Sequence, residues 1–329
     1  MLRNATFRQL AALNAVARLG SVSRAASELH LTQPSVSIQI KLLEEAAGAP
    51  LLERAGRGVR LSSAGETMAG YAARILDLWR EAGDEMAALR GVFAGTLRIG
   101  AVTTAEYVLP PTLVAFARQY PDVQVDLRVG NRGEIVRMLA GQEVDIAVMG
   151  RPPGELKTVS SAFARHPMAF LVAADHPLMT RRRRATLAEL IDTRLLVRER
   201  GSGTRTTLER LYREAGIDLR IGSELSSNEA IKQMCAAGFG TAFLSLHTCS
   251  LEVEAGILAV LPMDGNPLER EWFVMHLAAR HLPRIASAFE QFLIADGQHL
   301  VDAMARPKAA RAARVPTRKP RAANAGKGR

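Results

Sequence analysis

The clearest hydrophobic pattern in the chain lies between residues 21 and 44, SVSRAASELHLTQPSVSIQIKLLE. Its apolar residues recur at intervals of three and four, which predicts two short helices joined by a tight break. Ser21 and Thr32 are suited to cap the two helices. Pro34 fits the first turn of the second helix, where a missing N–H costs nothing. The stretch therefore predicts a helix-turn-helix.

The second of these helices has an unusual outward face. Val36, Ile40 and Leu43 should point inward, and short hydrogen-bonding side chains remain outside. Such a face suits a recognition helix, whose N-terminal turn enters the major groove and whose Gln and Ser side chains read base edges. An ordinary helical hairpin with its polar face in water is the alternative. The residues expected to contact DNA from this helix are Thr32, Gln33, Pro34, Ser35, Ser37 and Lys41.

The flanking segments extend this module to residues 1–62. A helix is expected over residues 6–19, and a short hairpin after Gly48 carries Arg54, Arg57 and Arg60 among glycines. Arginines on a hairpin beside a recognition helix are typical of a wing that follows the phosphate backbone. A solvated basic loop is the alternative.

A long helix should fill the segment 63–91. Its apolar residues keep helical spacing from about residue 64 to residue 90. A helix of that length outside a compact domain needs a partner, and the same helix of a second copy is the simplest one. The pattern therefore predicts a linker helix that also forms a homodimer.

From residue 96 onward, short apolar strands alternate with helices. This alternation predicts an α/β fold with parallel sheets. We expect an effector-binding domain over residues 92–305, with lobe I formed by about 92–162 and 266–305 and lobe II by about 163–265. The chain should cross between the lobes near 158–165 and 264–270. A ligand cleft belongs between the lobes, at the C-terminal ends of their strands, as in periplasmic binding proteins.

Charge is distributed unevenly along the 329 residues, whose net charge is +10. Residues 306–329 carry nine Lys or Arg and no acid, and residues 1–61 carry eight basic and four acidic residues. The large middle of the chain is therefore mildly acidic. This asymmetry indicates a nucleic-acid-binding module attached to a neutral domain. The basic tail is disordered by composition, and it either adds non-specific DNA affinity or does nothing measurable.

No apolar run approaches the roughly 18–20 residues that span a bilayer, and the N-terminus lacks a signal-peptide pattern. We therefore expect a cytoplasmic protein without a membrane partner. Cys235 and Cys249 lie in no paired metal-ligand pattern, so we expect packed structural thiols and no metal site. The arginines at 181–184 are interpreted as a solvated turn, with a DNA contact as the alternative.

Enzyme motifs are missing from the sequence. It contains no G-x-S-x-G elbow, no P-loop lysine motif and no H-E-x-x-H. We therefore expect no catalytic residues. A two-lobed solute-binding protein would need a signal peptide and no DNA module, and an architectural DNA-binding protein would need no two-lobed cleft.

Several strand ends in the two expected lobes carry a helix N-terminus or a donor-rich loop. Free N–H groups and the positive end of a helix dipole favour an anion, and arginines add bidentate partners for phosphate or carboxylate. The expected ligand is a small anionic metabolite acting as an allosteric effector. The candidate effector-binding residues, some of which are expected to be helix caps only, are Thr103, Thr104, Asn131, Arg132, Arg151, Ser202, Thr204, Arg205, Ser227, Asn228, His247 and Thr248.

The segment RAASELHLTQPSVSIQIKLLEEAAGAPLLER at 24–54, followed by RLSSAGE, resembles the LysR-type transcriptional regulators. The resemblance covers residues 5 to about 296. It implies a winged helix-turn-helix, a linker helix and a two-lobed effector domain. Many family members have a polar residue where this chain has Ile38, so base contacts are expected from Gln33, Ser35, Ser37 and Lys41.

Within that family, the effector domain is similar to the regulators of Calvin-cycle (RuBisCO operon) genes. The segments 131–153, 198–205 and 226–248 carry this similarity. It implies control of carbon-fixation genes, with control of another central-carbon operon as the alternative. It also implies a sugar phosphate or a nucleotide as effector. The expected partners are double-stranded DNA with a dyad operator, further copies of this chain in a homodimer that pairs into a homotetramer, and RNA polymerase as a further candidate.

Overall fold

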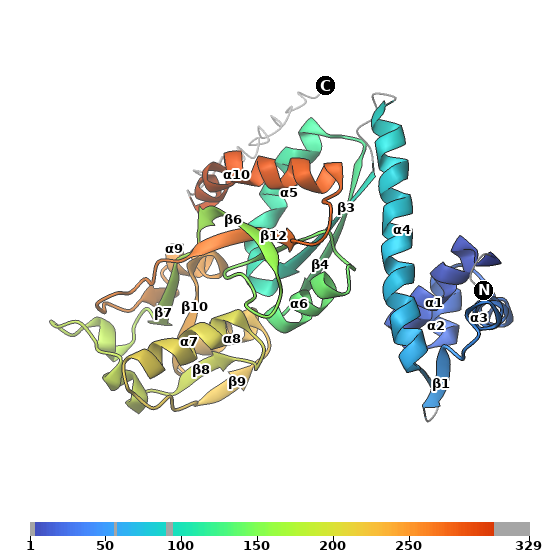
Figure 1. Ribbon diagram of the computed structural model, residues 1–329. Helices are drawn as coiled ribbons and strands as arrows, with labels where there is room; N and C mark the ends of the chain where they lie inside the picture. The colour runs from blue at the N-terminus through green and yellow to red at the C-terminus, as the bar shows by residue number, and fades with distance from the viewer. Residues whose placement is uncertain (1–3, 56–57, 90–94, 306–329) are drawn as a thin grey trace, which may run out of the picture.

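A computed structural model describes residues 4–55, 58–89 and 95–305 (Figure 1). The chain forms a small N-terminal module, one long helix and a two-lobed α/β domain. The expected basic tail at 306–329 lies outside the described residues. The elements of the N-terminal module are α1 (Phe7–Leu19), α2 (Val22–Glu28), α3 (Gln33–Ala47), β1 (Leu52–Ala55) and β2 (Gly58–Leu61).

The caps of α3 explain why this helix begins and ends where it does. The hydroxyl of Thr32 accepts from the backbone N–H of Ser35, and Pro34 occupies the first turn. Gly48 ends the helix with a φ of 71°, a left-handed conformation that glycine adopts without strain. The predicted inward residues of α3 are confirmed as buried: Val36, Ile40 and Leu43.

The long helix is α4 (Ser63–Leu89). Its cap is Ser62, whose hydroxyl accepts from the N–H of Gly65 at 3.0 Å. The first half of α4 belongs to the N-terminal module, because Ala69 and Ala72 pack into a core with residues of α1 and α3. Beyond that core, α4 carries a line of exposed large apolar side chains, namely Tyr71, Ile75, Leu78, Trp79 and Met86.

Lobe I contains a five-stranded sheet in the order β4-β3-β5-β12-β6. Helices α5 and α10 cover one face and α6 covers the other, each burying an apolar core against the strands. The strands are β3 (Gly95–Val102), β4 (Val123–Gly130), β5 (Ile146–Met149), β6 (Thr158–Arg165) and β12 (Glu271–Leu277). The helices are η2 (Thr103–Tyr107), α5 (Leu109–Gln119), α6 (Arg132–Ala140) and α10 (Arg284–Ala305).

Lobe II contains a second five-stranded sheet in the order β11-β7-β10-β8-β9. Helices α7 and α8 pack on it through separate apolar cores. The strands are β7 (Met168–Ala173), β8 (Leu195–Arg198), β9 (Ser223–Leu225), β10 (Thr241–Ser245) and β11 (Leu258–Val260). The helices are η3 (Pro177–Met179), η4 (Ala188–Asp192), α7 (Gly203–Glu214), α8 (Asn228–Ala236), η5 (Leu246–Thr248) and α9 (Ser250–Glu254).

The predicted α/β fold is confirmed, but both five-stranded sheets are mixed rather than parallel throughout. Parallel pairing holds for β3 with β4 and β5, and for β8 with β9 and β10, where helices connect the strands. Strand β12 enters lobe I from lobe II without a preceding helix and runs antiparallel to β5 and β6. Strand β7 follows β6 directly and runs antiparallel to β10 and β11.

The chain crosses between the lobes later than residue 162. Strand β6 continues to Arg165, which pairs with Glu271 at the start of β12. The first crossing is therefore made by His166 and Pro167. The second crossing precedes β12, within the expected range 264–270. Among the described residues, no helix is both long enough and apolar enough to cross a membrane.

Candidate functional site

Helix α3 presents a polar face to solvent. The side chains of Gln33, Ser37 and Lys41 are exposed along it, with Thr32 and Pro34 at its N-terminus. No acidic residue occupies the first turn, so the positive end of the helix dipole is uncompensated there. This face can meet a phosphate backbone and the base edges beside it.

Two of the residues expected on this face are already hydrogen-bonded. Ser35 is half-buried, and its hydroxyl lies 2.7 Å from the Thr32 hydroxyl, so Ser35 and Thr32 both take part in capping α3. The hydroxyl of Ser23 donates to Gln33 Oε1 at 3.1 Å, which leaves the amide NH₂ of Gln33 facing outward. Ile38 is 55% exposed, an apolar residue on an otherwise polar face.

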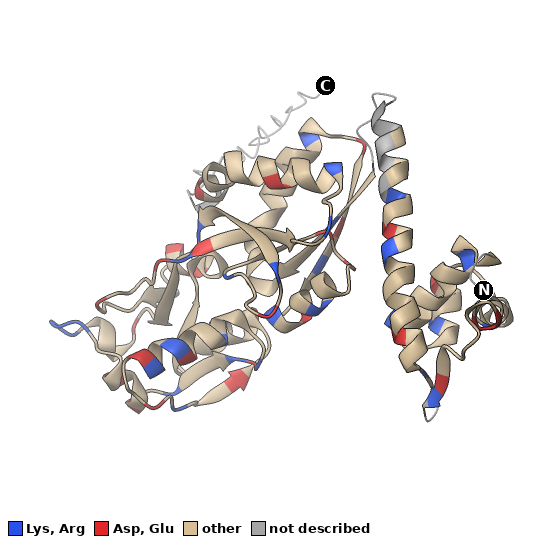
Figure 2. Cartoon of the chain, in the orientation of Figure 1, with Lys and Arg blue, Asp and Glu red and all other residues tan. Residues whose placement is uncertain are grey.

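The β1–β2 hairpin stands beside α3 and carries charges of both signs, which Figure 2 shows. Arg60 pairs with Glu53 across the hairpin, with Nη2 2.8 Å from Oε2, and both side chains remain exposed. Arg54 is also exposed. Arg57 lies outside the described residues. The hairpin therefore offers one unpaired and one paired arginine within its described part.

A cavity lies between the lobes, where β3, β5 and α6 of lobe I face α7 of lobe II. The space between its lining atoms, open solvent included, is about 630 Å³, of which the centre of a water-sized sphere can occupy about 60 Å³. Ser202 precedes α7 as N-cap, but its hydroxyl makes no capping bond, so the first amides of α7 are not capped by that side chain. Seven residues predicted from the sequence line the cavity: Thr103, Thr104, Asn131, Arg132, Arg151, Ser202 and Thr204.

Further polar residues of the cavity were missed in the sequence. Arg210 and Thr207 lie on α7 at the spacing i+7 and i+4 from Gly203, so they share its face toward lobe I. That spacing is the signal that could have found them. Arg270 reaches the cavity from the second crossing, where Nη2 donates to the carbonyl of Gly150 at 2.8 Å and Nη1 donates to Thr207. No sequence pattern indicates this position, because only the tertiary fold brings Arg270 to the cavity.

The cavity is strongly positive. Four arginines line it, and no Asp or Glu does so among the described residues. Arg132 pairs outside with the exposed Glu155, at 2.9 Å. Burial, together with the charges of Arg210 and Arg151, lowers the pKa of Arg270 to about 10. Arg210 lies 3.8 Å from Glu214, whereas Arg151 and Arg270 have no ion-pair partner among the described residues. The free protein therefore holds these guanidinium groups close together with incomplete charge compensation, an arrangement that an anion would relieve.

His166 forms part of the inner wall. Its ring is buried and stacks on Trp272 with centroids 3.7 Å apart. Neither ring nitrogen has a hydrogen-bond partner within the described part of the chain. Burial lowers the pKa of His166 well below its ordinary value, and His247 and Arg270 add to this shift. The imidazole is therefore neutral, with one N–H available as a donor.

The remaining predicted residues do not line the cavity. Arg205 points to the opposite side of α7, where Nε lies 2.5 Å from Glu209 and Nη1 lies 3.1 Å from Glu224. Ser227 caps α8, and Thr248 donates to the carbonyl of Ser245. His247 accepts from the indole N–H of Trp272 at 3.2 Å and faces another surface cavity.

Asn228 already has a hydrogen-bond partner, a residue that sequence reasoning missed. The buried guanidinium of Arg198 donates to Asn228 Oδ1 and, across the lobes, to the hydroxyl of Thr103 at 3.2 Å. Glu199 balances its charge at 2.8 Å. Arg198 thus ties the lobes together beside the cavity, and it explains why Asn228 is not available to a ligand.

The remaining chemical candidates behave as structural residues. Cys235 and Cys249 are buried as predicted, and burial raises the pKa of their thiols to about 11 and about 12. No cluster of metal-ligating side chains occurs among the residues searched in the described ranges. In the arginine run at 181–184, Arg181 and Arg183 pair with Glu189 at the surface, which agrees with a solvated turn.

Comparison with known proteins bears on both the module and the cavity. Residues 7–66 match the model of bacterial regulatory helix-turn-helix proteins of the LysR family, and residues 90–298 match the LysR substrate-binding domain. The transcriptional regulator CbbR of Rhodospirillum rubrum is 42% identical over 295 residues, which cover 89% of this chain and 98% of that protein. A RuBisCO operon transcriptional regulator of Acidithiobacillus ferrooxidans is 38% identical and covers 91% and 97%.

A solved structure matches the two-lobed domain. The regulatory domain of CcmR from Synechocystis PCC6803, in complex with 2-PG, is 35% identical with a TM-score of 0.58, covering 61% of this chain and 96% of that one. The two family models together span nearly the whole described chain, in the order that the fold shows. The chain therefore belongs to the LysR family of DNA-binding transcriptional regulators.

Proposed function

We propose that this regulator controls carbon-fixation (RuBisCO and Calvin-cycle) genes in response to a small phosphorylated anion bound between its lobes. The observation that carries the effector half of this proposal is the cavity, which four arginines line and to which the described part of the chain contributes no acidic residue. Multiply charged ligands are the ones that such a cluster selects, because each added negative charge relieves repulsion among the guanidinium groups.

The proposed effector is a sugar phosphate or a nucleotide. Its anionic group would contact Arg210 and Arg270 at the inner end, and the uncapped amides of α7 beside Ser202. Asn131, Arg132 and Arg151 would contact the rest of the molecule from lobe I. The bound 2-PG in the CcmR regulatory domain supports a phosphorylated ligand for this fold.

The proposed target genes rest on the relatives. A regulator of the RuBisCO operon and a CbbR both match over about nine-tenths of the chain. Control of another central-carbon operon is the alternative, and it would be favoured by an effector outside carbon fixation. A solute-binding role finds no support, because a DNA-binding module precedes the lobes.

The proposed assembly is a homodimer that pairs again into a homotetramer on a dyad operator. The exposed apolar line on α4, which includes Leu78 and Trp79, supports pairing of two copies through this helix. We propose 1–62 as the DNA-binding domain, 63–91 as the linker helix and 92–305 as the effector domain. Contact with RNA polymerase would follow from the bend that such an assembly imposes on the operator.

Calorimetric titration of the full chain tests the effector half. The panel contains 2-PG, ribulose 1,5-bisphosphate, phosphoenolpyruvate, NADPH and ATP, with ribose as the uncharged control. We expect at least one phosphorylated compound to bind at one site per chain, more weakly as salt rises, and ribose not to bind. Binding of none of them, or binding of ribose with equal affinity, would reject the proposal.

Replacing Gln33 by Ala tests the DNA half. The outward amide of Gln33 is placed to read a base edge, so its loss should reduce discrimination between operator and random DNA by about 1–3 kcal/mol while leaving non-specific affinity nearly unchanged. Fluorescence anisotropy at fixed salt measures both affinities. Gln39→Ala is the matched control, because Gln39 is half-buried on the same helix. Equal loss on both DNAs would make Gln33 a positioning residue.

A further inference from the structure

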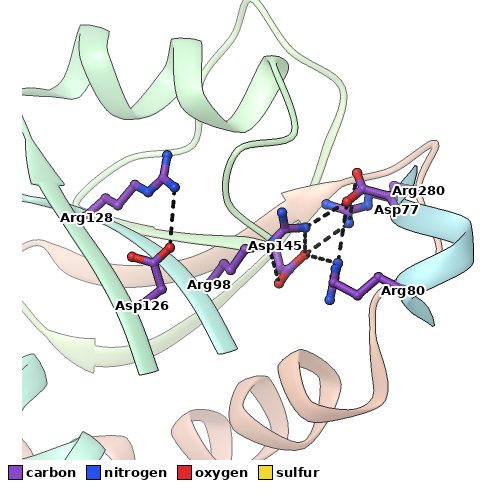
Figure 3. A network of polar contacts seen from close by, with 7 residues as sticks. All are labelled: Asp77, Arg80, Arg98, Asp126, Arg128, Asp145 and Arg280. Carbon is purple, nitrogen blue, oxygen red and sulfur yellow. Dashed lines mark hydrogen bonds and ion pairs between the residues drawn. The ribbon is translucent and has the colours of Figure 1, made fainter. Parts of the chain in front are cut away.

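Five charged side chains join α4 to lobe I, and we call them the linker joint: Asp77, Arg80, Arg98, Asp145 and Arg280 (Figure 3). Asp145 Oδ1 lies 3.2 Å from Arg80, 2.9 Å from Arg98 and 3.0 Å from Arg280. Asp77 lies 3.0 Å from Arg98 and 3.3 Å from Arg280. Two residues of α4 are thus interlocked with three residues of the effector domain.

The linker joint is largely buried, which distinguishes it from ion pairs that form incidentally at the surface. The side chain of Asp145 has no exposed surface, and those of Arg98 and Arg280 are exposed by only 20% and 15%. Half-exposed pairs such as Arg128 with Asp126 can exchange partners with water, whereas a buried carboxylate shared by three guanidinium groups allows few alternative arrangements. The position of α4 against lobe I is therefore defined by this contact.

The effector-domain members of the joint lie in or next to β3, β5 and β12, and the opposite end of each strand lies at or next to a residue that lines the cavity. Arg98 is in β3, whose far end is Val102, a cavity residue. Asp145 immediately precedes β5, whose far end is Met149, and Arg280 follows β12, which begins next to Arg270. The three strands are neighbours in the sheet, with β5 paired to β3 and β12.

The three strands form a short and stiff connection between the cavity and the linker joint. Val102 is four positions from Arg98, and Met149 is four positions from Asp145, which is roughly 13 Å at about 3.3 Å per residue. The backbone ladder holds β3, β5 and β12 in one register, for example at Ile99 with Ile146. A displacement at the cavity end of these strands must therefore appear at the joint end, or the ladder must break.

The other end of α4 is part of the DNA-binding module. Ala69 and Ala72 are buried with Leu13 of α1 and Leu43 of α3. A rotation of α4 about the linker joint thus moves the recognition helix with it, because α4 shares a buried core with α1 and α3. Figure 1 shows α4 running from the module to the side of lobe I.

We infer that the linker joint transmits the state of the cavity to the DNA-binding module, through β3, β5 and β12 and then α4. The inference rests on the proposed function, since it assumes an effector in the cavity. It assigns Asp77 and Arg80 a coupling role that involves contact with neither DNA nor effector. If the joint only fixed the resting position of α4, loosening it would leave the effect of the effector on operator affinity intact.

The test uses the full-length double variant Asp77→Asn with Arg80→Gln. It removes the charges that α4 contributes, and it leaves the buried Asp145 paired with Arg98 and Arg280, so the effector domain keeps its fold. Operator affinity is measured by anisotropy without ligand and with each of the five phosphorylated compounds of the calorimetric panel. Calorimetry measures the affinity for the same compounds.

We expect the effector to change the operator affinity of the wild type by roughly 5- to 150-fold, the usual range of allosteric coupling. In the double variant, this ratio should fall below about twofold, while ligand affinity and ligand-free operator affinity stay within about threefold of the wild type. Arg74→Gln is the matched control, because Arg74 is exposed on α4 and makes no ion pair among the described residues. It should retain the full response.

Two results would overturn the inference. One is a double variant whose operator affinity responds to the effector as the wild type does. The other is a double variant that no longer binds the compound, which would make Asp77 and Arg80 part of the architecture of the cavity. A wild type that binds none of the five compounds would instead refute the proposed function, and the inference would fall with it.

Discussion

Arg270→Met should weaken binding of the phosphorylated effector by about 2–5 kcal/mol, which is roughly 30-fold or more. The guanidinium of Arg270 is held at the inner end of the cavity by the Gly150 carbonyl and the Thr207 hydroxyl, and its pKa is lowered to about 10 by burial and by neighbouring arginines. An anion would relieve that strain in the wild type. The Arg270→Met variant carries no charge at this position, so it gains less free energy from binding an anion.

The stability of the ligand-free protein distinguishes this account from general damage. Removing a buried charge among like charges should leave the melting temperature of the free Arg270→Met variant unchanged or higher. Arg200→Met is the control, because Arg200 is exposed in the loop before α7 and does not line the cavity. Wild-type affinity in the Arg270→Met variant, measured by calorimetry, would contradict the proposed site.

Asp145→Asn should destabilise the effector domain by about 3–5 kcal/mol. Burial alone would raise the pKa of Asp145, but the hydrogen bond and charge of Arg98, with the charges of Arg80 and Arg280, outweigh it and hold this pKa below its ordinary value. Without the carboxylate, three guanidinium groups share Asp77 alone. Urea denaturation of the full chain at pH 7 measures the loss.

The pH dependence of this difference has a definite sign. A carboxylate whose pKa is lowered in the folded state contributes stability above its unfolded pKa and loses it as the pH falls through the folded value. The gap between wild type and Asp145→Asn should therefore close below about pH 4. Asp126→Asn, at a half-exposed pair with Arg128, should cost less than about 1 kcal/mol. Equal losses at the two positions would contradict the account.

Local chemistry made the N-terminal module predictable. A capping threonine, a first-turn proline and a terminal glycine bound α3, and its inward residues follow from spacing alone. The direction of β12 could not be predicted in the same way. An apolar strand pattern reports burial, but strand pairing is decided by where the chain enters the sheet, and β12 enters from the other lobe.

The sequence predicts residues of the cavity chiefly where a helix N-terminus follows a strand. Arg132 and Ser202 were found because each opens a helix at a strand end. Arg205 was misplaced because the residue two positions into α7 faces away from lobe I, toward Glu224. The linker joint had no sequence signal, since its residues lie up to 203 positions apart in the chain and meet only through the fold.

The central claim is that an anion between the lobes controls how this regulator binds DNA. The most direct measurement is a footprint of the full chain on the intergenic DNA upstream of its own gene, with and without each phosphorylated compound, at one fixed salt concentration. The account predicts a specific footprint whose length or affinity changes with at least one compound. A specific footprint that none of the compounds alters would contradict it.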